Sequence, residues 1–566
     1  MDKKKNRKFL KKFLLISVIL MTILLLIPSS PVVKAADDDS DGMTNDQEMT
    51  LLIQYAPILY FKAGENFFPV DCTYFLNNSE IWEWSGAVRT LVEANPTLDN
   101  IDDGYSVSSF LDYAANYTDI LGNYTANLST WGYKYYGRVI NISGYLCLQY
   151  WFFYMYNDHS LNQHEGDWET IVILLDSITG EPQRAAYSQH YVAQVAAWNE
   201  IEKTGNHSHV YVALGSHANY FRPCQGKFGL ENDEVGNDGF QLPYDHLQLE
   251  IELLGEKGAH NASQNWLEFE GRWGDWLNLY DAFIGFAGPH TPGEEENQAK
   301  WVNPVIWATT SMSVNSTWFM LSCFMSYLLW IFLGIFAGLC LWKVYKAIKN
   351  RTSGESAKLS TVLGGRAAFG VFLGLVAMGI TVAIIFLPWY RVYIDISGVI
   401  SAKGDIILID GMNGIQANLL VGGSGMSPLF NVAIPFYIIL GTGIVLTFLD
   451  IIGATSAKKL GTKFITSGLI FIILLITMLV LMWQLGSLVS MIAPMFNLSP
   501  AQLTEIQNIM NAISAAPFGG KQTFAITGLG NVDFIWGFMI GGWLLLAAAI
   551  VKIVAGITLR TTPEEA

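Results

Sequence analysis

The residues best suited to chemistry in this sequence are histidines and carboxylates gathered between positions 164 and 217. Residues 163–169 read QHEGDWE and carry one histidine, two glutamates and one aspartate. Imidazole and carboxylate groups that meet at one rim of a sheet can hold a divalent metal ion, and a nearby glutamate can activate a bound water. The candidate metal ligands are His164, Asp167, His190 and His217, and the candidate catalytic bases are Glu165 and Glu169.

A structural role explains the same HEGDWE motif, which we expect to form a turn between two strands. Trp168 precedes the apolar run TIVILL at 170–175. Alternation along a strand would turn the Trp168 ring toward the core and place Asp167 and Glu169 on the opposite face. The chain lacks HExxH or another tight ligand spacing. We therefore favour a structural motif, and expect Trp168→Ala to unfold the domain but His217→Ala to leave it folded.

A second metal pattern lies at residues 37–48, which read DDDSDGMTNDQE. A twelve-residue calcium loop needs oxygen ligands at positions one, three, five, seven, nine and twelve, with glycine at six. The sequence places a suitable residue at each position: Asp37, Asp39, Asp41, Met43, Asn45 and Glu48. The spacing resembles the single calcium loops of dockerin and thrombospondin type 3 repeats and predicts a structural calcium clip. The alternative is an acidic, disordered terminus.

The elements that position these residues read as β-strands. Six aromatic and β-branched segments are separated by Gly, Asn and Pro, whereas one helix is indicated at 106–117. The predicted strands are 55–61, 144–156, 168–176, 183–190, 209–215 and 247–254. This pattern predicts a mainly β ectodomain over residues 51–315, built as an antiparallel β-sandwich.

The rest of the chain has the composition of a membrane protein, with 51% apolar and 14% charged residues over 566 positions. Residues 1–35 read as a signal peptide, or alternatively as an uncleaved signal anchor, and residues 36–50 hold the calcium loop. An α-helical membrane domain of five spans is predicted within 316–566. The spans are 318–341, 367–387, 429–448, 464–485 and 534–554.

Lysines predict the orientation of these spans. Basic residues cluster at 343–366 and 458–463, between spans one and two and between spans three and four. The positive-inside rule places both clusters in the cytoplasm, so the β domain and the loops 390–425 and 491–533 lie outside. The first of these loops alternates like a hairpin. We predict a multi-pass protein of the cell membrane with its carboxyl terminus in the cytoplasm.

Net charge and short sequence motifs limit the classes of binding partner that we expect. A net charge of −16 disfavours nucleic-acid binding. Glycine pairs at 334/338, 370/374 and 537/541 permit close helix packing within the chain or in an oligomer. Asp450 and Lys552 lie near predicted cytoplasmic ends and are expected to reach water. An exported, glycosylated surface is predicted from the acceptor asparagines Asn77, Asn116, Asn123, Asn127, Asn141, Asn206, Asn261, Asn315 and Asn497.

Five motifs in the ectodomain appear in a fixed order: YAPILYF at 55–61, HEGDWE at 164–169, YSQH at 187–190, GSHANYF at 215–221 and GRWG at 271–274. Across residues 51–307 their order and spacing resemble the family named after vacuolar protein sorting-associated protein sixty-two, which implies no settled reaction. The DWE core is more weakly similar to necrosis-inducing secreted proteins, whose HDWE motif lies near a divalent cation and which act on membrane lipids. Gly166 stands here where that motif has a second histidine.

Three function classes are consistent with these features. A surface binding or adhesion protein accounts for the acidic ectodomain, the calcium loop and an unknown extracellular ligand. A metal-dependent hydrolase of an extracellular substrate would use the histidines and carboxylates. An auxiliary subunit of a transport complex would account for the spans, but such proteins usually carry ionisable groups within the membrane. We rank the three classes in that order.

Overall fold

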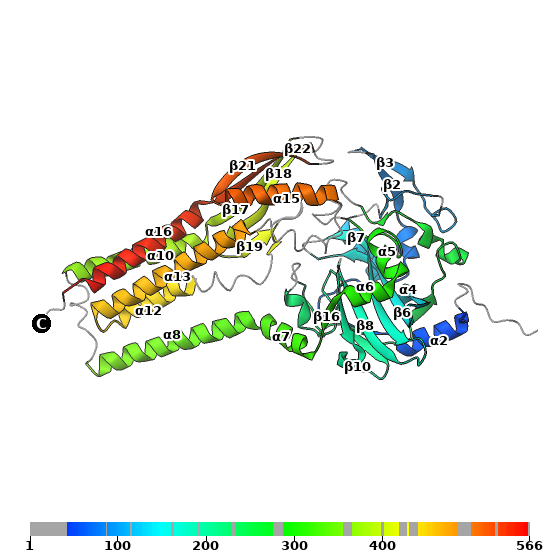
Figure 1. Ribbon diagram of the computed structural model, residues 1–566, viewed down its shortest axis with the longest axis horizontal. Coiled ribbons are helices and arrows are strands. Elements are labelled where there is room, and N and C mark those ends of the chain that lie inside the picture. Colours follow the sequence, from blue (N-terminus) through cyan, green and yellow to red (C-terminus); the bar gives the residue numbers. More distant parts are fainter. Residues whose placement is uncertain are drawn as a thin grey trace, which may run out of the picture.

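The computed structural model describes the chain from residue 42 to residue 563 with internal gaps. The described residues are 42–85, 88–102, 104–113, 116–159, 163–190, 192–228, 233–275, 287–354, 365–397, 401–417, 427–428, 440–484, 500–526 and 530–563. The predicted signal peptide, the calcium ligands Asp37, Asp39 and Asp41, and the acceptor Asn497 lie outside these residues. A β-rich domain occupies one end of the molecule and a bundle of long helices the other (Figure 1).

A seven-stranded sheet forms the centre of the β domain. In spatial order its strands are β14 (Leu249–Leu253), β5 (Tyr133–Ile142), β6 (Tyr145–Asn157), β7 (His164–Asp176), β8 (Pro182–Gln189), β9 (Val192–Ala197) and β16 (Met312–Val314). Strands β6 and β7 are buried along almost their whole length on both faces. Because their sequences are continuous apolar runs, both faces of this sheet require a covering layer.

A five-stranded sheet covers one face of the central sheet. It comprises β10 (Lys203–Thr204), β11 (His207–Val212), β1 (Ile58–Phe61) and β13 (Gln241–Leu242), with β12 (Asn219–Tyr220) paired to β11. Tyr150 and Phe152 of β6 pack in one core with Leu59 of β1 and Val210 of β11. This layer carries β11 and the turn after it across the same face as Asp167.

A four-stranded sheet and two helical segments cover the other face. The strands are β15 (Arg272–Trp273), β4 (Ser109–Asp112), β2 (Glu80–Ser85) and β3 (Val88–Glu93), and the helical segments are α4 (Tyr117–Trp131) and η3 (Ala262–Glu268). Trp151 and Phe153 of β6 pack in this second core with Leu111 of β4, Tyr124 of α4 and Trp266 of η3.

The mainly β character of the ectodomain is confirmed, but the antiparallel sandwich is not. Four strand pairs are parallel, namely β1–β11, β4–β15, β5–β14 and β9–β16. The sheets form three layers because the doubly buried β6 and β7 must be covered twice. The helix expected at 106–117 is also wrong, since that segment contains β4, and α4 starts only at Tyr117 after Asn116 caps it.

Shorter elements complete the domain and connect it to the helices. They are α2 (Asn45–Tyr55), α3 (Thr73–Leu76), η1 (Trp198–Glu200), η2 (Gln225–Phe228), α5 (Glu295–Val302), α6 (Pro304–Thr310) and α7 (Ser316–Ser326). Helix α7 packs on the β domain, where Phe319 lies 6.1 Å from Phe221 between ring centroids. The Ser326 hydroxyl donates to the Cys224 carbonyl at 2.5 Å. These contacts dock the start of the membrane region on the ectodomain.

Four described helices are long and apolar enough to cross a membrane, which supports a membrane protein. They are Trp330–Asn350 within α8 (Leu328–Thr352), α10 (Gly365–Ile385), Ala457–Val480 within α13 (Ala457–Trp483) and α16 (Ile540–Arg560). Five were expected. The third expected span, 429–448, is described only from residue 440, as a π-helix (Gly441–Leu446) and α12 (Thr447–Ile452), which together are shorter than a span.

A fourth sheet, of six strands, stands on the helical bundle, at its end nearer the β domain (Figure 1). Its order is β20 (Ser427–Pro428), β19 (Gly414–Ala417), β18 (Ser401–Asp410), β17 (Pro388–Ser397), β22 (Gly530–Phe538) and β21 (Gly519–Ile526), and α15 (Pro500–Ala515) packs nearby. The hairpin expected at 390–425 is confirmed as β17 and β18. Because β17 follows α10, β22 precedes α16 and the two strands pair, both loops lie on one side of the bundle.

Three further expectations for the helices need correction. The final span starts at Ile540 rather than 534 because β22 occupies 530–538, so Gly537 is a strand residue. The first apolar helix lies at 330–350 rather than 318–341, because α7 belongs to the ectodomain contact. Lys552 does not reach water; it is 1% exposed and donates to the Thr442 carbonyl at 3.2 Å. Gly370 and Gly374 do pack within the chain, against Leu559 and Phe464.

Candidate functional site

The HEGDWE motif begins strand β7 and does not form the expected turn. Asp167 pairs with Tyr154 and His164 pairs with Asn157 on β6. Gly166 explains how a polar motif stays in register here. Its φ is +58°, and a Cβ at this position would lie 2.4 Å from the carbonyl oxygen of Trp273. Only glycine therefore lets β7 run this close to the GRWG segment.

Trp168 and its two acidic neighbours divide between the faces of β7, as the alternation predicts. Trp168 is 2% exposed, and its ring lies 5.0 Å from Phe153 and 5.2 Å from Trp266 between centroids. Asp167 and Glu169 lie on the other face with His217 and Ser188. The motif thus builds an aromatic core on one side and a polar network on the other.

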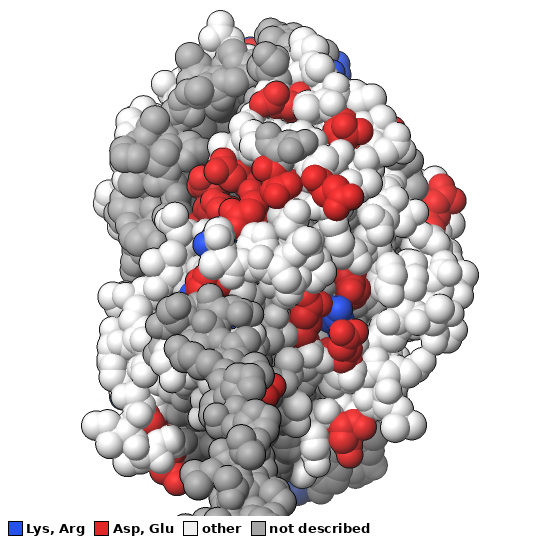
Figure 2. All heavy atoms as spheres, turned by 90° about the vertical axis from the view of Figure 1, so that its right-hand side faces the viewer, with Lys and Arg blue, Asp and Glu red and all other residues white. Residues whose placement is uncertain are grey.

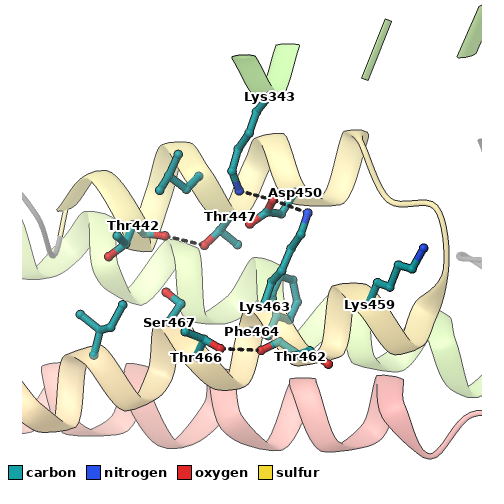
Figure 3. Close-up of a pocket in the computed structure, with 12 residues that line it drawn as sticks. Lys343, Thr442, Thr447, Asp450, Lys459, Thr462, Lys463, Phe464, Thr466 and Ser467 are labelled. Atoms are coloured by element: carbon teal, nitrogen blue, oxygen red, sulfur yellow. Dashed lines mark hydrogen bonds and ion pairs between the residues drawn. The ribbon is translucent and has the colours of Figure 1, made fainter. Parts of the chain in front are cut away.

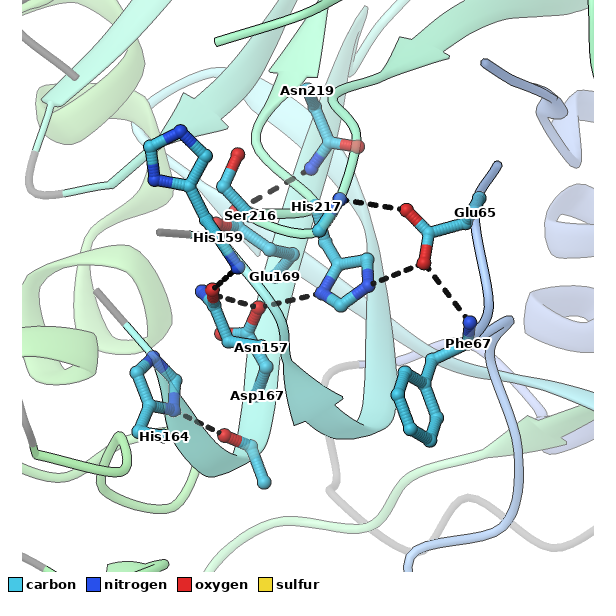
Figure 4. Close-up of polar contacts among 12 residues, drawn as sticks. Glu65, Phe67, Asn157, His159, His164, Asp167, Glu169, Ser216, His217 and Asn219 are labelled. Atoms are coloured by element: carbon cyan, nitrogen blue, oxygen red, sulfur yellow. Dashed lines mark hydrogen bonds and ion pairs between the residues drawn. The ribbon is translucent and has the colours of Figure 1, made fainter. Parts of the chain in front are cut away.

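His217 is the centre of the polar network (Figure 4). Its side chain is fully buried, with Nδ1 2.9 Å from Asp167 Oδ2 and Nε2 3.5 Å from Glu65 Oε1. Tyr154 stacks on the imidazole at 3.8 Å between centroids and an interplanar angle of 2°. Burial disfavours the charged ring, but the two carboxylates outweigh it and raise the pKa of His217 to about 9. A protonated imidazole therefore bridges two buried carboxylates at neutral pH.

Backbone contacts fix the Glu65 end of this bridge. Glu65 accepts from the backbone N–H of Gly215 at 2.8 Å and of Phe67 at 2.9 Å. His217 itself has a φ of +54°, an unfavourable conformation for a residue with a Cβ. The pairing with Asp167 and Glu65 holds it there. The network joins the loop after β1, the turn after β11 and the start of β7.

The two candidate bases lie in different surroundings. Glu169 accepts from the Ser188 hydroxyl, and burial followed by the negative charge of Asp167 raises its pKa to about 8. Glu165 accepts from the backbone N–H of Tyr113 at 2.9 Å, beside the four-stranded sheet, and burial raises its pKa to about 7. They do not converge on one reacting centre.

The four residues proposed for a second metal site are not gathered around one point. Asp167 and His217 contact each other, whereas His164 Nδ1 lies 2.7 Å from the carbonyl oxygen of Gly166. His190 Nε2 lies 3.0 Å from Asp233 Oδ2, in a separate pair that Ser216 and Tyr220 join through their hydroxyls. Among the described residues no group of three or more His, Cys, Asp or Glu is arranged to hold a metal ion.

Sequence reasoning missed four members of these networks: Glu65, Ser188, Asn219 and Asp233. Asn219 lies two residues after His217 in the chain, and its Nδ2 lies 3.5 Å from Glu169 Oε2. Ser188 and Asn219 fall inside the YSQH and GSHANYF motifs, so the motifs themselves contained the signal. Glu65 and Asp233 lie in loops without any pattern that marks them as buried.

Part of the predicted calcium loop is described. Asn45 is the first residue of α2, and Thr44 caps this helix in a reciprocal capping box with Gln47. Glu48, the proposed twelfth position, lies in the first turn and is 5% exposed. The helix thus begins within the proposed loop, at its ninth position, and the last proposed ligand is buried. The prediction of calcium binding stays open, since three ligands lie outside the described residues.

Several predicted acceptor asparagines have structural roles of their own. The side chains of Asn116, Asn261 and Asn315 accept backbone N–H bonds at the starts of α4, η3 and α7. Asn-x-Ser/Thr is also a favourable helix start, because Asn is among the best N-cap residues. Glycosylation stays a prediction at all the acceptor sites.

An open pocket of about 690 Å³ lies on the outer side of the five-stranded sheet, away from the buried network. The rings of Tyr60 and Tyr211 stack 5.1 Å apart at 24°, and His209 lies 5.0 Å from Tyr60. Glu202 borders the pocket, accepting from the Tyr211 hydroxyl at 2.5 Å and pairing with Arg222 Nε at 3.1 Å. Lys203, Gly205 and Asn237 complete the polar rim.

Charge on the distal face of the β domain is mainly negative. Figure 2 shows groups of Asp and Glu side chains on the face turned away from the helical bundle, with few Lys or Arg among them. This distribution agrees with the net charge of −16. Such a face favours neutral or cationic partners over anionic ones.

No protein-family model matches the chain, and no curated protein matches it either. Among solved structures, NLPPya in complex with glucosamine is 16% identical, covering 46% of this chain and 90% of its own, with a TM-score of 0.24. Non-toxic HaNLP3 is 15% identical, and the match covers 44% of this chain and 87% of HaNLP3, with a TM-score of 0.23. Necrosis and Ethylene inducing Protein 2, from the causal agent of cocoa's Witches Broom disease, is 17% identical. That match covers 36% of this chain and 72% of the other, with a TM-score of 0.19. Likenesses with such TM-scores carry no argument about fold or function.

Proposed function

We propose that this membrane protein displays its β domain on the outer face of the membrane and binds a hydroxyl-rich carbohydrate there. The observation that carries the proposal is the open pocket of Tyr60, Glu202, His209 and Tyr211. Its aromatic surfaces suit the apolar faces of a sugar ring, while its carboxylate and amide groups suit the hydroxyls. The proposal concerns the ligand class and not a particular glycan.

The pocket is prepared for a ligand because its polar groups are held in place. Glu202 is fixed by the hydroxyl of Tyr211 on one side and the guanidinium of Arg222 on the other. His209 Nε2 lies 2.9 Å from the Thr204 hydroxyl, and burial lowers the pKa of His209. The imidazole is therefore neutral at physiological pH and offers a hydrogen bond without a charge.

Hydrolysis ranks second because the acid–base groups are closed off. His217 is 0% exposed, Glu169 4% and Asp167 6%, and each is bonded to another protein group. A substrate would have to open this network to reach them. We also propose that the calcium loop serves as a clip at the amino terminus of the domain, and that the ectodomain belongs to the vacuolar protein sorting-like family described above.

Carbohydrate binding can be tested with the full-length protein in detergent on a glycan array, followed by titration of the strongest ligand. Tyr60→Ala should weaken binding at least tenfold by removing one stacked ring, and Glu202→Gln should weaken it by removing the charged acceptor. Tyr244→Ala is the matched control, since Tyr244 is 36% exposed and stacks on His207 rather than lining the pocket. Equal affinities for wild type, Tyr60→Ala and Tyr244→Ala would refute the pocket assignment.

A further inference from the structure

The helical bundle contains a pocket with a charged and apolar lining at the end opposite the six-stranded sheet. Its volume is about 520 Å³, and it lies between α8, α12 and α13 (Figure 3). Lys343 enters from α8, Asp450 from α12, and Lys459 and Lys463 from α13. A second pocket, also of about 520 Å³, shares these four residues and adds Lys346. The two pockets thus meet at one charged cluster.

Positive charge exceeds negative charge in this cluster. Lys343 pairs with Asp450 Oδ1, and Lys463 Nζ lies 2.7 Å from the same oxygen. Four lysines and one aspartate line the second pocket. A single carboxylate therefore holds two lysines in position without neutralising the cluster. The lining that the structure describes offers an excess of cationic hydrogen-bond donors.

A neutral donor extends the same pocket. Ser467 Oγ is buried and has no hydrogen-bond partner among the described residues, although its side chain lines the pocket. The hydroxyls of Thr462 and Thr466, on the same helix, already donate to the carbonyls of Lys458 and Thr462 at 3.1 Å. An anion with several oxygens could accept from the lysines and from Ser467 together, which is the donor set that phosphate groups prefer. A buried hydroxyl without a partner would then be satisfied.

The place of the pocket favours a lipid over a soluble anion. Leu446, Phe464 and Ile470 also line the pocket, together with the charged residues. The apolar span of α8 is 0% buried within the protein, so its side chains are free to face acyl chains. Lys459 and Lys463 lie in the first two turns of α13, at the depth where headgroups lie, and Lys343 reaches the same carboxylate from within α8. A phospholipid can place its phosphate on the lysines and its chains along these apolar side chains.

We propose that the pocket between α8, α12 and α13 binds the phosphate of an anionic phospholipid, with Lys343, Lys459 and Lys463 as cationic donors and Asp450 as their positioning residue. The lysine-rich loops place this end of the bundle on the cytoplasmic side, where anionic lipids attract basic segments. Bound lipid would join α8 to the remaining helices through charges that the protein alone leaves unbalanced.

The test uses full-length protein in nanodiscs of phosphatidylcholine with increasing phosphatidylglycerol, with lipid retention measured by native mass spectrometry. Lys459→Gln should weaken phosphatidylglycerol retention about tenfold, since it removes a charged donor to the bound phosphate, and a hydrogen bond to a charged group contributes on that order. Lys458→Gln is the matched control: it removes the same charge one residue away, but Lys458 lines neither pocket. A preserved elution volume and helical circular dichroism spectrum would show that both variants are folded.

Preferential retention of phosphatidylglycerol by wild type and Lys458→Gln, with loss in Lys459→Gln, would support the site. Equal loss in both variants would overturn it, because surface charge alone would then explain retention. Equal retention of phosphatidylcholine and phosphatidylglycerol would also overturn it. In a parallel arm with millimolar inorganic phosphate, displacement of the lipid or equal thermal stabilisation by phosphate would assign the pocket to a soluble anion instead.

Discussion

Replacing His217 should reveal a buried charge that contributes strongly to the stability of the β domain. The imidazole lies between Asp167 and Glu65, at 2.9 and 3.5 Å, and is fully buried. In the substitution His217→Gln, an amide of similar reach replaces the ring but cannot carry charge. Both carboxylates then remain buried with a neutral partner, which is costly in a low-dielectric interior. The sequence alone predicted no such effect for this residue.

The pKa of His217 gives the magnitude. It rises from an ordinary value of 6.5 to about 9 in the folded protein. At about 1.4 kcal/mol per pKa unit, protonated His217 contributes roughly 3 kcal/mol to the free energy of unfolding. Since the folded pKa is the higher one, this contribution is fully present below pH 6.5 and is lost as pH rises through about 9. The total free energy of unfolding of a typical domain is about 5–15 kcal/mol.

Hydrogen–deuterium exchange of β6 and β7 peptides in the full-length protein, with urea, measures the local free energy of unfolding. Wild type should exceed His217→Gln by roughly 3 kcal/mol near pH 6 and by less than about 0.5 kcal/mol near pH 9.5. Glu169 also lowers stability as pH rises above 4.5, the ordinary pKa of a glutamate, because its pKa is raised in the folded protein. Subtracting the stability of His217→Gln from that of wild type removes this contribution. His207→Gln is the control, since His207 Nδ1 contacts only the Ala56 carbonyl at 2.9 Å among the described polar groups. A wild-type minus His217→Gln difference that is the same at both pH values would refute a charged His217.

Three further predictions follow from the fold. Trp168→Ala should lower the free energy of unfolding by about 3–5 kcal/mol, measured by the same exchange assay, because it empties the centre of an aromatic core; a loss below about 1 kcal/mol would contradict the packing. A cysteine at Ser401, in β18, should react with an impermeant maleimide on intact cells, and one at Ser456, before α13, should not; the reverse result would invert the orientation. Glu48→Ala should weaken calcium binding of about 10⁻⁴ M affinity and increase exchange in α2, and unchanged calcium uptake in calorimetry would reject the loop.

Periodicity located part of the strands and the four apolar helices, but it missed β2 to β5 and β9 and did not predict how the strands are arranged. The run GYLCLQYWFFYMY predicted β6, and the structure buries this non-alternating strand on both faces. A two-layer sandwich buries only one face of each sheet, so the three-layer arrangement follows from the same residues. The parallel pairs were beyond local reasoning, because β1 and β11 meet only through contacts distant in sequence. The predicted start of the last span was wrong because β22 is as apolar as the helix that it precedes.

The candidate site shows a similar division. Alternation correctly separated Trp168 from Asp167 and Glu169, since it depends only on neighbouring residues. It could not show that His190 pairs with Asp233, or that His164 points to the carbonyl of Gly166. Histidine density in the sequence therefore overstated convergence in space. The chemistry of the site depends on the carboxylates that pair with the histidines, such as Glu65 and Asp233. These carboxylates lie in loops, and their positions depend on the tertiary fold.

The pairing of β17 with β22 gives the membrane region a constraint that hydropathy cannot provide. These strands belong to loops separated by more than a hundred residues, yet they are hydrogen-bonded from Tyr390–Phe538 to Ile396–Val532. Both loops must therefore be on the same side of any membrane the helices cross. The chain between them includes α12 and α13, whose connecting turn at 453–456 lies at the far end of the bundle. The chain therefore leaves that side and returns to it between β17 and β22, and α13, which is long and apolar enough to cross a membrane, carries it back. The turn at 453–456 borders the same pocket as Lys343, Lys459 and Lys463, so these lysines lie at the end of the bundle away from the six-stranded sheet.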